Sequence, residues 1–283
     1  MSFCVGIVYI SVCVCYDDVN LKVTGGTVMN VTQIIFSPTG GTEKVADIIT
    51  NEWGMPVSKI DLSDAKTDYP ALSLTKEDIA VIAVPSYGGR VPALAAQRIS
   101  KIHGNQTRCI IVCVYGNRAY EDTLIELKDI AEKSGFRVIA AIAAIAEHSI
   151  IHQYAEGRPD SKDRSELQHF AEKIMDKING NSSEITTLQI PGNNPYKKAG
   201  GAGLVPKADN KCTGCGLCAK RCPSQAIGIE NLKATDSKKC ISCMRCVVHC
   251  PQSARKVNGA MVSVAALALK KTCSVRKENE LYV

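Results

Sequence analysis

The sequence predicts an α/β protein in which a doubly wound, five-stranded parallel sheet is followed by a small cysteine-rich domain. Segments with the patterns of strands and helices alternate along the first two thirds of the chain. The strand segments are uninterrupted runs of Val, Ile and Ala, which are typical of strands covered on both faces, as in parallel sheets. The second domain is indicated by the cysteines, since eight of the 14 fall between Cys212 and Cys250.

The predicted elements of the first domain follow in β-α-β order. The strand candidates are residues 31–36, 56–60, 79–85, 108–114 and 137–145. The helix candidates are residues 41–52, 92–102, 121–134 and 161–179. Doubly wound sheets bind ligands at the carboxyl ends of their strands, so the loops that follow these strands form the candidate site.

The loop after the first strand candidate suits a phosphate group. It reads Ser37-Pro38-Thr39-Gly40-Gly41-Thr42 and leads into a helix, whose N-terminus offers unpaired N–H groups and a positive dipole end. The glycines allow close backbone approach and the hydroxyls add donors, but the spacing is neither G-x-x-x-x-G-K-[ST] nor G-x-G-x-x-G. Neutral donors of this kind suit a phosphate monoester cofactor. An ordinary capped turn is the alternative.

Two later strand candidates end in loops that place an aromatic residue beside glycines. The third strand is followed by Ser86, Tyr87, Gly88, Gly89 and Arg90, and the fourth by Tyr115, Gly116, Asn117 and Arg118. An aromatic ring in such a loop can lie against a flat cofactor ring while backbone N–H groups meet its edge. Each loop alone is compatible with plain turn chemistry, but three loops at one edge of one sheet predict a common ligand site.

These loops resemble those of flavodoxins, over about residues 29–185. The pattern Ser37-x-Thr39-Gly40-x-Thr42 is similar to the loop that binds the phosphate of flavin mononucleotide (FMN), and the two later loops resemble those that flank its isoalloxazine ring. The segments AEHSI (146–150) and EGRPDSKD (156–163) resemble parts of flavodoxin-like domains fused to ferredoxins. The resemblance implies that FMN binds here, with ring contacts from Tyr87 and from the backbone of 87–90 and 116–119. His148 is either a ring contact or a structural residue, and no segment matches the flavodoxin Trp loop.

The cysteine-rich segment contains one motif twice. CTGCGLCAKRCP and CISCMRCVVHCP both read C-x2-C-x2-C-x3-C-P. The segment resembles bacterial two-cluster ferredoxins, in which the fourth cysteine of each motif binds the other motif's cluster. We therefore expect one [4Fe–4S] cluster on Cys212, Cys215, Cys218 and Cys250, and the other on Cys240, Cys243, Cys246 and Cys222. Zinc sites usually pair two CxxC motifs, or CxxC with His, and a disulfide framework needs a secreted context that the sequence does not indicate.

The chain is expected to have five parts. They are an extension (1–28), a flavodoxin-like FMN-binding domain (29–189), a Pro/Gly-rich linker (190–206), a 2[4Fe–4S] ferredoxin domain (207–258) and a helical tail (259–283). The codons for Gly25 and Gly26 can spell a purine-rich ribosome-binding sequence. They lie at a suitable distance before the Met29 codon for bacterial initiation. We hypothesise that translation starts at Met29, and a genuine β-rich extension is the alternative.

Charge and composition argue against several classes of protein. The formal charge of +6 is scattered and only 5% of residues are aromatic, so we expect no nucleic-acid partner. No segment reaches the ~20 apolar residues of a membrane helix, and the apolar run 3–16 lacks the features of a secretory signal. Oxygen-sensitive clusters and reduced thiols favour a cytoplasmic, anaerobic setting. Basic residues of the ferredoxin segment would offset cluster charge, or simply form a solvated face; they include Lys220, Arg221, Arg245, Arg255 and Lys256.

The sequence thus predicts an electron-transfer flavo-iron–sulfur protein that relays electrons between two [4Fe–4S] clusters and FMN. Its expected partners are redox proteins or a low-potential electron donor. The alternative is an FMN-dependent oxidoreductase that reduces a small acceptor with electrons supplied through the clusters. The sequence contains no dinucleotide-binding motif and no general acid–base pair near the loops, and this weakens that alternative. Cys109 and Cys113, on a buried strand candidate, are expected to be packing residues.

Overall fold

The computed structural model describes residues 29–180, 188–200 and 203–283. The expectation for residues 1–28 concerns a segment outside the described residues. Within the described ranges, no helix is both long and apolar enough to span a membrane.

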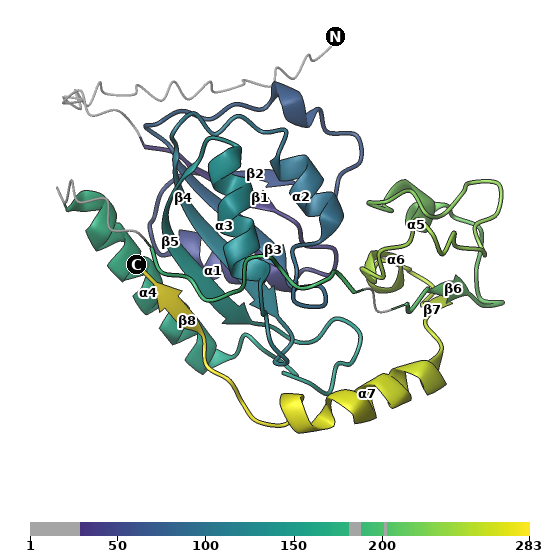
Figure 1. Ribbon diagram of the computed structural model, residues 1–283. Helices are drawn as coiled ribbons and strands as arrows, with labels where there is room; N and C mark the ends of the chain where they lie inside the picture. Colours follow the sequence, from purple (N-terminus) through teal and green to yellow (C-terminus); the bar gives the residue numbers. More distant parts are fainter. Residues whose placement is uncertain (1–28, 181–187, 201–202) are drawn as a thin grey trace, which may run out of the picture.

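The first domain is built on the predicted five parallel strands (Figure 1). They are β1 (Val31–Ile35), β2 (Val57–Asp61), β3 (Ile79–Pro85), β4 (Arg108–Tyr115) and β5 (Arg137–Ile145). The sheet order is β2-β1-β3-β4-β5, followed by a sixth strand, β8. The order 2-1-3-4-5 is that of flavodoxin-like doubly wound sheets, and it confirms the predicted fold class.

The sixth strand is a difference from the expected helical tail. Helix α7 (Gly259–Cys273) does form, but the chain then returns to the first domain, where β8 (Glu280–Tyr282) pairs antiparallel with β5. A strand of three residues has too little periodicity to be found in a sequence. It forms because β5 would otherwise leave a row of unpaired backbone groups at the edge of the sheet.

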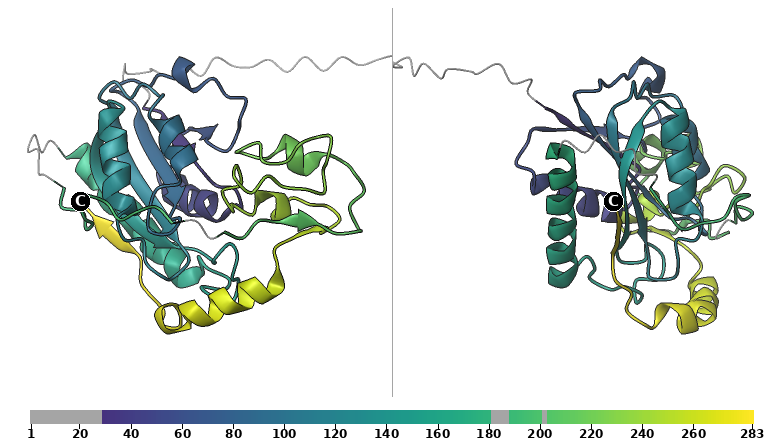
Figure 2. Two further views of the ribbon diagram at one scale, coloured as in Figure 1. Left: turned by 45° about the vertical axis from the view of Figure 1, so that its right-hand side comes forward. Right: turned by 60° about the vertical axis from the view of Figure 1, so that its left-hand side comes forward.

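Helices cover both faces of the sheet (Figures 1 and 2). Helices α1 (Gly41–Asn51) and α4 (Ser161–Asn179) pack on one face, and α2 (Ala93–Ile99) and α3 (Thr123–Lys133) on the other. Alternate residues of β3 enter the two cores: Ala80, Ile82 and Val84 lie under α2 and α3, and Ile79, Val81 and Ala83 under α1 and α4. Each fully buried Ile or Val contributes about 1.5–3 kcal/mol of hydrophobic free energy. A short 3₁₀ turn, η1 (Tyr69–Ala71), connects β2 to β3.

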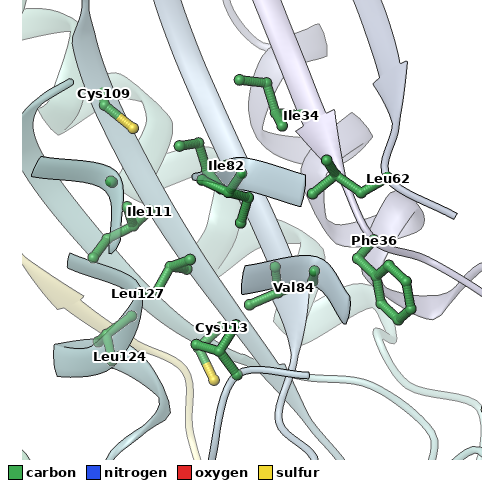
Figure 3. Packing of buried hydrophobic residues seen from close by; sticks show 14 of the residues in the cluster. Ile34, Phe36, Leu62, Ile82, Val84, Cys109, Ile111, Cys113, Leu124 and Leu127 are labelled. Atoms are coloured by element: carbon green, nitrogen blue, oxygen red, sulfur yellow. The ribbon is translucent and has the colours of Figure 1, made fainter. Parts of the chain in front are cut away.

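The cysteines of β4 are part of this core. Cys109 and Cys113 are both completely buried on the α2 and α3 side, among Ile, Leu and Val side chains (Figure 3). Burial strongly raises the pKa of both thiols. They are packing residues, as the sequence predicts.

The second domain is a structural repeat. Two four-residue helices, α5 (Leu217–Lys220) and α6 (Arg245–Val248), lie at equivalent places in the two motifs, and the short strands β6 (Lys207–Ala208) and β7 (Arg255–Lys256) pair antiparallel. Left-handed backbone conformations recur at equivalent positions of the two halves: Gly214 and Ser242, Gly216 and Met244, Gln225 and Ser253. The repeat in the sequence is therefore a repeat of backbone geometry.

The two domains are joined at both ends of the second one. On the N-terminal side, the Asp122 carboxylate accepts hydrogen bonds from the backbone amides of Asn193 (2.8 Å) and Lys197 (2.7 Å), so the linker lies along the start of α3. On the C-terminal side, α7 leads from the second domain back to β8 (Figures 1 and 2). The second domain is thus held between two segments that are both anchored on the first.

Candidate functional site

The loop between β1 and α1 retains free donors. Gly40 adopts a left-handed conformation (φ 91°) at the start of α1, and a Cβ there would point into open space. The Ser37 hydroxyl accepts a hydrogen bond from the Glu43 amide at 2.9 Å, which bends the loop around the helix N-terminus. Among the described residues, the backbone amides of 39–42 have no hydrogen-bond partner. Unpaired amides at a helix N-terminus fit a phosphate group.

The loop after β3 is a tight turn. The amide of Tyr87 donates to the carbonyl of Arg90 (3.0 Å), and the Arg90 amide donates back to Tyr87 (3.3 Å). The Tyr87 ring meets Phe36 edge to face, with ring centroids 6.5 Å apart. The guanidinium of Arg90 is already paired with both carboxylate oxygens of Glu126 on α3, at 2.7 Å each. The Tyr87 ring is therefore packed against Phe36 and the core, while Arg90 holds the turn against α3.

Ser86, Gly88 and Gly89 each have a different neighbour in this turn. The Ser86 hydroxyl is hydrogen bonded to the Thr123 hydroxyl at 2.7 Å. A Cβ at Gly88 would lie 2.8 Å from the carbonyl oxygen of Gly200, so the linker passes directly over this residue. A Cβ at Gly89 would clash with the Glu121 side chain. Only glycine allows these close approaches, and both glycines also have positive φ.

The predicted site residues in the loop after β4 have different surroundings. Tyr115 is only 5% exposed and packs on Tyr120, with ring centroids 5.3 Å apart, so its side chain belongs to the core. Gly116 lies under His148, because a Cβ there would be 2.7 Å from the imidazole ring and its Cβ. The His148 Nδ1 accepts hydrogen bonds from the amides of Ile150 and Ile151, both at 3.2 Å. These contacts support the structural reading of this histidine.

Asn117 connects the same loop to the C-terminal segment. It is 3% exposed with φ at 65°, and its Nδ2 donates to the carbonyls of Cys273 and Val275, both at 2.8 Å. Its Oδ1 accepts from the Lys277 amide at 3.2 Å, and the Lys277 ammonium donates to the Asn117 carbonyl at 2.8 Å. Arg118 is paired with Glu121 at 2.9 Å. The sequence contains no motif that could have revealed these tail contacts.

A second network ties the tail to α4. Asp163 is completely buried, and its carboxylate accepts from Arg158 Nε (2.8 Å), the Asp160 amide (2.9 Å) and Asn279 Nδ2 (3.0 Å). Burial alone would raise the pKa of Asp163, but these donors outweigh it and hold the pKa below its usual value. Arg158 and Asp163 come from the segment EGRPDSKD, so the structure uses that segment to anchor the C-terminus.

The cysteines of the second domain gather across the two motifs. Cys222 lines one cavity together with Cys240, Cys243 and Cys246, and the side chain of Ile241 lies at the same cavity. Burial is the largest cause that raises the pKa of Cys243 to about 12 and that of Cys246 to about 11, and a negative charge on the neighbouring Cys222 contributes to both values. This grouping is compatible with the crossed ligand assignment. The described cysteines are all free thiols.

Equivalent amides approach the fourth cysteine of each motif. The Ala226 amide donates to the Cys222 sulfur at 3.2 Å, and the Ala254 amide donates to the Cys250 sulfur at 3.3 Å. In the first motif, Cys215 is exposed at the surface. Thiols with amide donors and no disulfide partner fit iron–sulfur ligation, and hydrogen bonds to the sulfurs are one of the factors that set cluster potential.

The second motif faces the candidate ligand loops of the first domain. Ile241 packs against the core under α2 and α3. The His249 ring lies close to the backbone of Pro38, in the loop before α1. Burial raises the pKa of Tyr87, and a negative charge on nearby Cys243 raises it further. Cys243, which the sequence assigns to the second-motif cluster, therefore lies in the neighbourhood of Tyr87.

Two arginines join the domains beside this contact. The Arg98 guanidinium, 8% exposed, donates to the carbonyls of Leu62 (2.6 Å) and Pro223 (2.9 Å), one in each domain. Arg245 Nη2 lies 3.4 Å from a carboxylate oxygen of Asp61 at the end of β2. A buried arginine that bridges two carbonyl groups with separate donors fixes the relative orientation of the segments that carry them.

Comparisons with known proteins agree with this division of the chain. Residues 211–255 match the family of 4Fe-4S dicluster domains. A comparison with curated proteins found no match.

The first domain is similar in structure to several flavodoxins. A flavodoxin of Streptococcus pneumoniae TIGR4 is 19% identical, covers 52% of this chain and 99% of its own, and has a TM-score of 0.39. A flavodoxin from the domain Archaea is 15% identical (54% and 100% coverage, TM-score 0.39), and the Fusobacterium nucleatum flavodoxin bound to flavin mononucleotide is 14% identical (53% and 97%, TM-score 0.35). The strand order and the dicluster family match show that the chain joins an α/β domain of flavodoxin type to a 4Fe–4S dicluster domain.

Proposed function

We propose that this protein is an electron carrier that relays electrons between two [4Fe–4S] clusters and FMN. The dicluster domain implies the two clusters. Each cluster exchanges one electron, whereas FMN, when bound, takes up one or two. The observation that carries the proposal is the contact between the domains, in which Ile241 of the second motif packs on the same core as Tyr87 and Arg98 joins the two domains. A relay needs its centres close together, and the packing of the second motif on the first domain supports such an arrangement.

The first domain offers groups that fit FMN. The free amides of residues 39–42 would hold the phosphate, with the hydroxyls of Thr39 and Thr42 as further donors. The isoalloxazine ring would lie beside Tyr87, against the backbone of 87–90 and 116–119. Hydrogen bonds from Asn117 to the C-terminal segment, and the ion pair of Arg90 with Glu126, hold these two loops in place.

The contact also supports an order in which electrons pass through the two clusters. The cluster assigned to Cys240, Cys243, Cys246 and Cys222 is the one beside the first domain. The cluster assigned to the first motif includes the exposed Cys215, which gives it access to the surface. We infer that electrons pass between a redox partner and FMN by way of the first-motif cluster and then the second-motif cluster.

Two measurements test the proposal on the full chain under anaerobic conditions. Flavin released by acid is identified by chromatography, and FMN is expected. Stopped-flow spectroscopy after a pulse of reductant should then show a phase of flavin and cluster bleaching whose rate is independent of protein concentration, because the centres share one molecule. Absence of flavin after reconstitution, or flavin that stays oxidised beside reduced clusters despite a favourable potential difference, contradicts the relay.

A matched pair of variants tests the interface. Ile241→Asp places a charge where the second motif packs on the first domain, so it should slow the intramolecular phase at least tenfold. Ile229→Asp changes an isoleucine of the same domain that is 65% exposed and should leave the rate unchanged. Iron content and the cluster signals in electron paramagnetic resonance (EPR) establish that both variants carry their clusters. Equal rates in the two variants would show that this contact is not the route.

A further inference from the structure

Arg255 is a buried cation without a carboxylate partner among the described residues. Only 2% of it is exposed. Its Nη1 donates to the carbonyl of Leu232 at 2.6 Å, and its Nη2 to the carbonyls of Pro206 (3.3 Å) and Ala234 (3.4 Å) and to the Thr235 hydroxyl. Its Nε is buried with no hydrogen-bond partner in the described part of the chain. Burying a charge with only neutral partners costs free energy, so a negative charge nearby is expected to compensate it.

The guanidinium lies between the two cluster sites. Its Nη1 is 3.6 Å from the sulfur of Cys218, a residue assigned to the first-motif cluster. It also lies close enough to Cys246, a residue assigned to the second-motif cluster, for its positive charge to lower the pKa of that thiol. One cation therefore contacts a sulfur of the first site and acts on a sulfur of the second.

The internal repeat shows that the fold does not require this charge. The two motifs are offset by 28 residues, which places Ile227 at the position equivalent to Arg255. Ile227 is also buried, at 5% exposure. An apolar side chain thus satisfies the packing of this position in one half of the repeat, and a charged one occupies it in the other.

We propose that Arg255 is a shared electrostatic partner of the two clusters and raises the reduction potential of both. A [4Fe–4S] cluster with four thiolates carries a charge of about −2 when oxidised, and one electron from the reductant makes it about −3. A fixed positive charge between the clusters stabilises the reduced state more than the oxidised state. No bond or proton at Arg255 changes in this step. The inference rests on the clusters of the proposed function and not on FMN.

The test is a potentiometric titration of the full chain followed by the EPR signals of the reduced clusters. Arg255→Ile reproduces the residue of the other half of the repeat, and Arg255→Gln removes the charge but keeps amide donors. We expect both to lower both midpoint potentials. Lys256→Ile removes a charge from the next residue, which is exposed and paired with Asp209 at 3.2 Å, so solvent screening should make its shift smaller.

Arg255→Lys keeps the charge and should restore potentials close to those of the wild type. Neutral variants that load both clusters and shift no further than Lys256→Ile overturn the proposal. If neither neutral variant assembles its clusters, the Arg255→Lys variant decides the question. A shift of its midpoint potentials larger than that of Lys256→Ile would show that the positive charge alone is not responsible, and this would overturn the proposal. The signals come from the clusters only, so protein without FMN gives the same result and a failed relay does not affect the test.

Discussion

Replacing Asn117 tests how the C-terminal segment is held against the loop that follows β4. The side chain makes three hydrogen bonds to the backbone of Cys273, Val275 and Lys277, at 2.8, 2.8 and 3.2 Å. A buried hydrogen bond contributes about 1 kcal/mol net, so removing all three should lower the free energy of unfolding by about 3 kcal/mol. Asn117→Gly removes them while tolerating the positive φ of 65°. Asn117→Ala should cost about 1 kcal/mol more, because alanine is strained in that conformation.

The assay is urea denaturation followed by the fluorescence of Trp53, the single tryptophan of the chain, which packs on the core under α1 and α4. Asn105→Gly is the matched control, since Asn105 also has positive φ (44°) but its side-chain hydrogen bonds, to Ser73 and Leu74, lie near solvent. We expect less than about 1 kcal/mol of destabilisation there, because water replaces such bonds readily. An Asn117→Gly protein as stable as the Asn105→Gly protein would refute the anchoring role of Asn117.

Three further predictions concern the cofactor sites and the tail. Cys222→Ala should remove the EPR signal of the second-motif cluster and Cys250→Ala that of the first-motif cluster, whereas uncrossed ligation would give the reverse. Gly40→Val should weaken FMN binding at least tenfold in equilibrium titrations, while Gly54→Val, also at positive φ with open space around it, should leave the affinity unchanged. The lowered pKa of Asp163 stabilises the fold above the usual carboxyl pKa of about 3.9, and this contribution is lost as the pH falls through the lower folded value. The difference in melting temperature between wild type and Asp163→Asn should therefore shrink between pH 5 and pH 2; a constant difference contradicts the assignment.

The elements of the sheet and the two cysteine motifs were predictable because their signals are local. Continuous apolar runs mark strands buried on both faces, and residues 79–85 and 137–145 were predicted with the bounds that β3 and β5 have in the structure. The cysteine spacing identified the dicluster domain, because short loops around a cubane allow few other spacings. The prediction that the loop at 37–42 binds a phosphate also depends on local signals, namely glycine and a helix N-terminus.

The roles of side chains at the edges of the site depended on the tertiary structure. Arg90, Asn117 and Arg118 follow strands at the expected edge, yet they bind Glu126, the C-terminal segment and Glu121, which are up to about 160 residues away in sequence. Hydrogen bonding selects any partner with the right geometry, and a sequence does not state which distant segment will be next to a loop. The strand β8, the packing of the second motif on the first domain and the contact of Arg255 with Cys218 also depend on segments that are distant in sequence. The sequence by itself determined that the chain contains an α/β domain of flavodoxin type and a dicluster domain. Only the tertiary structure decided how the two domains face one another, because that depends on packing between segments with no shared local pattern.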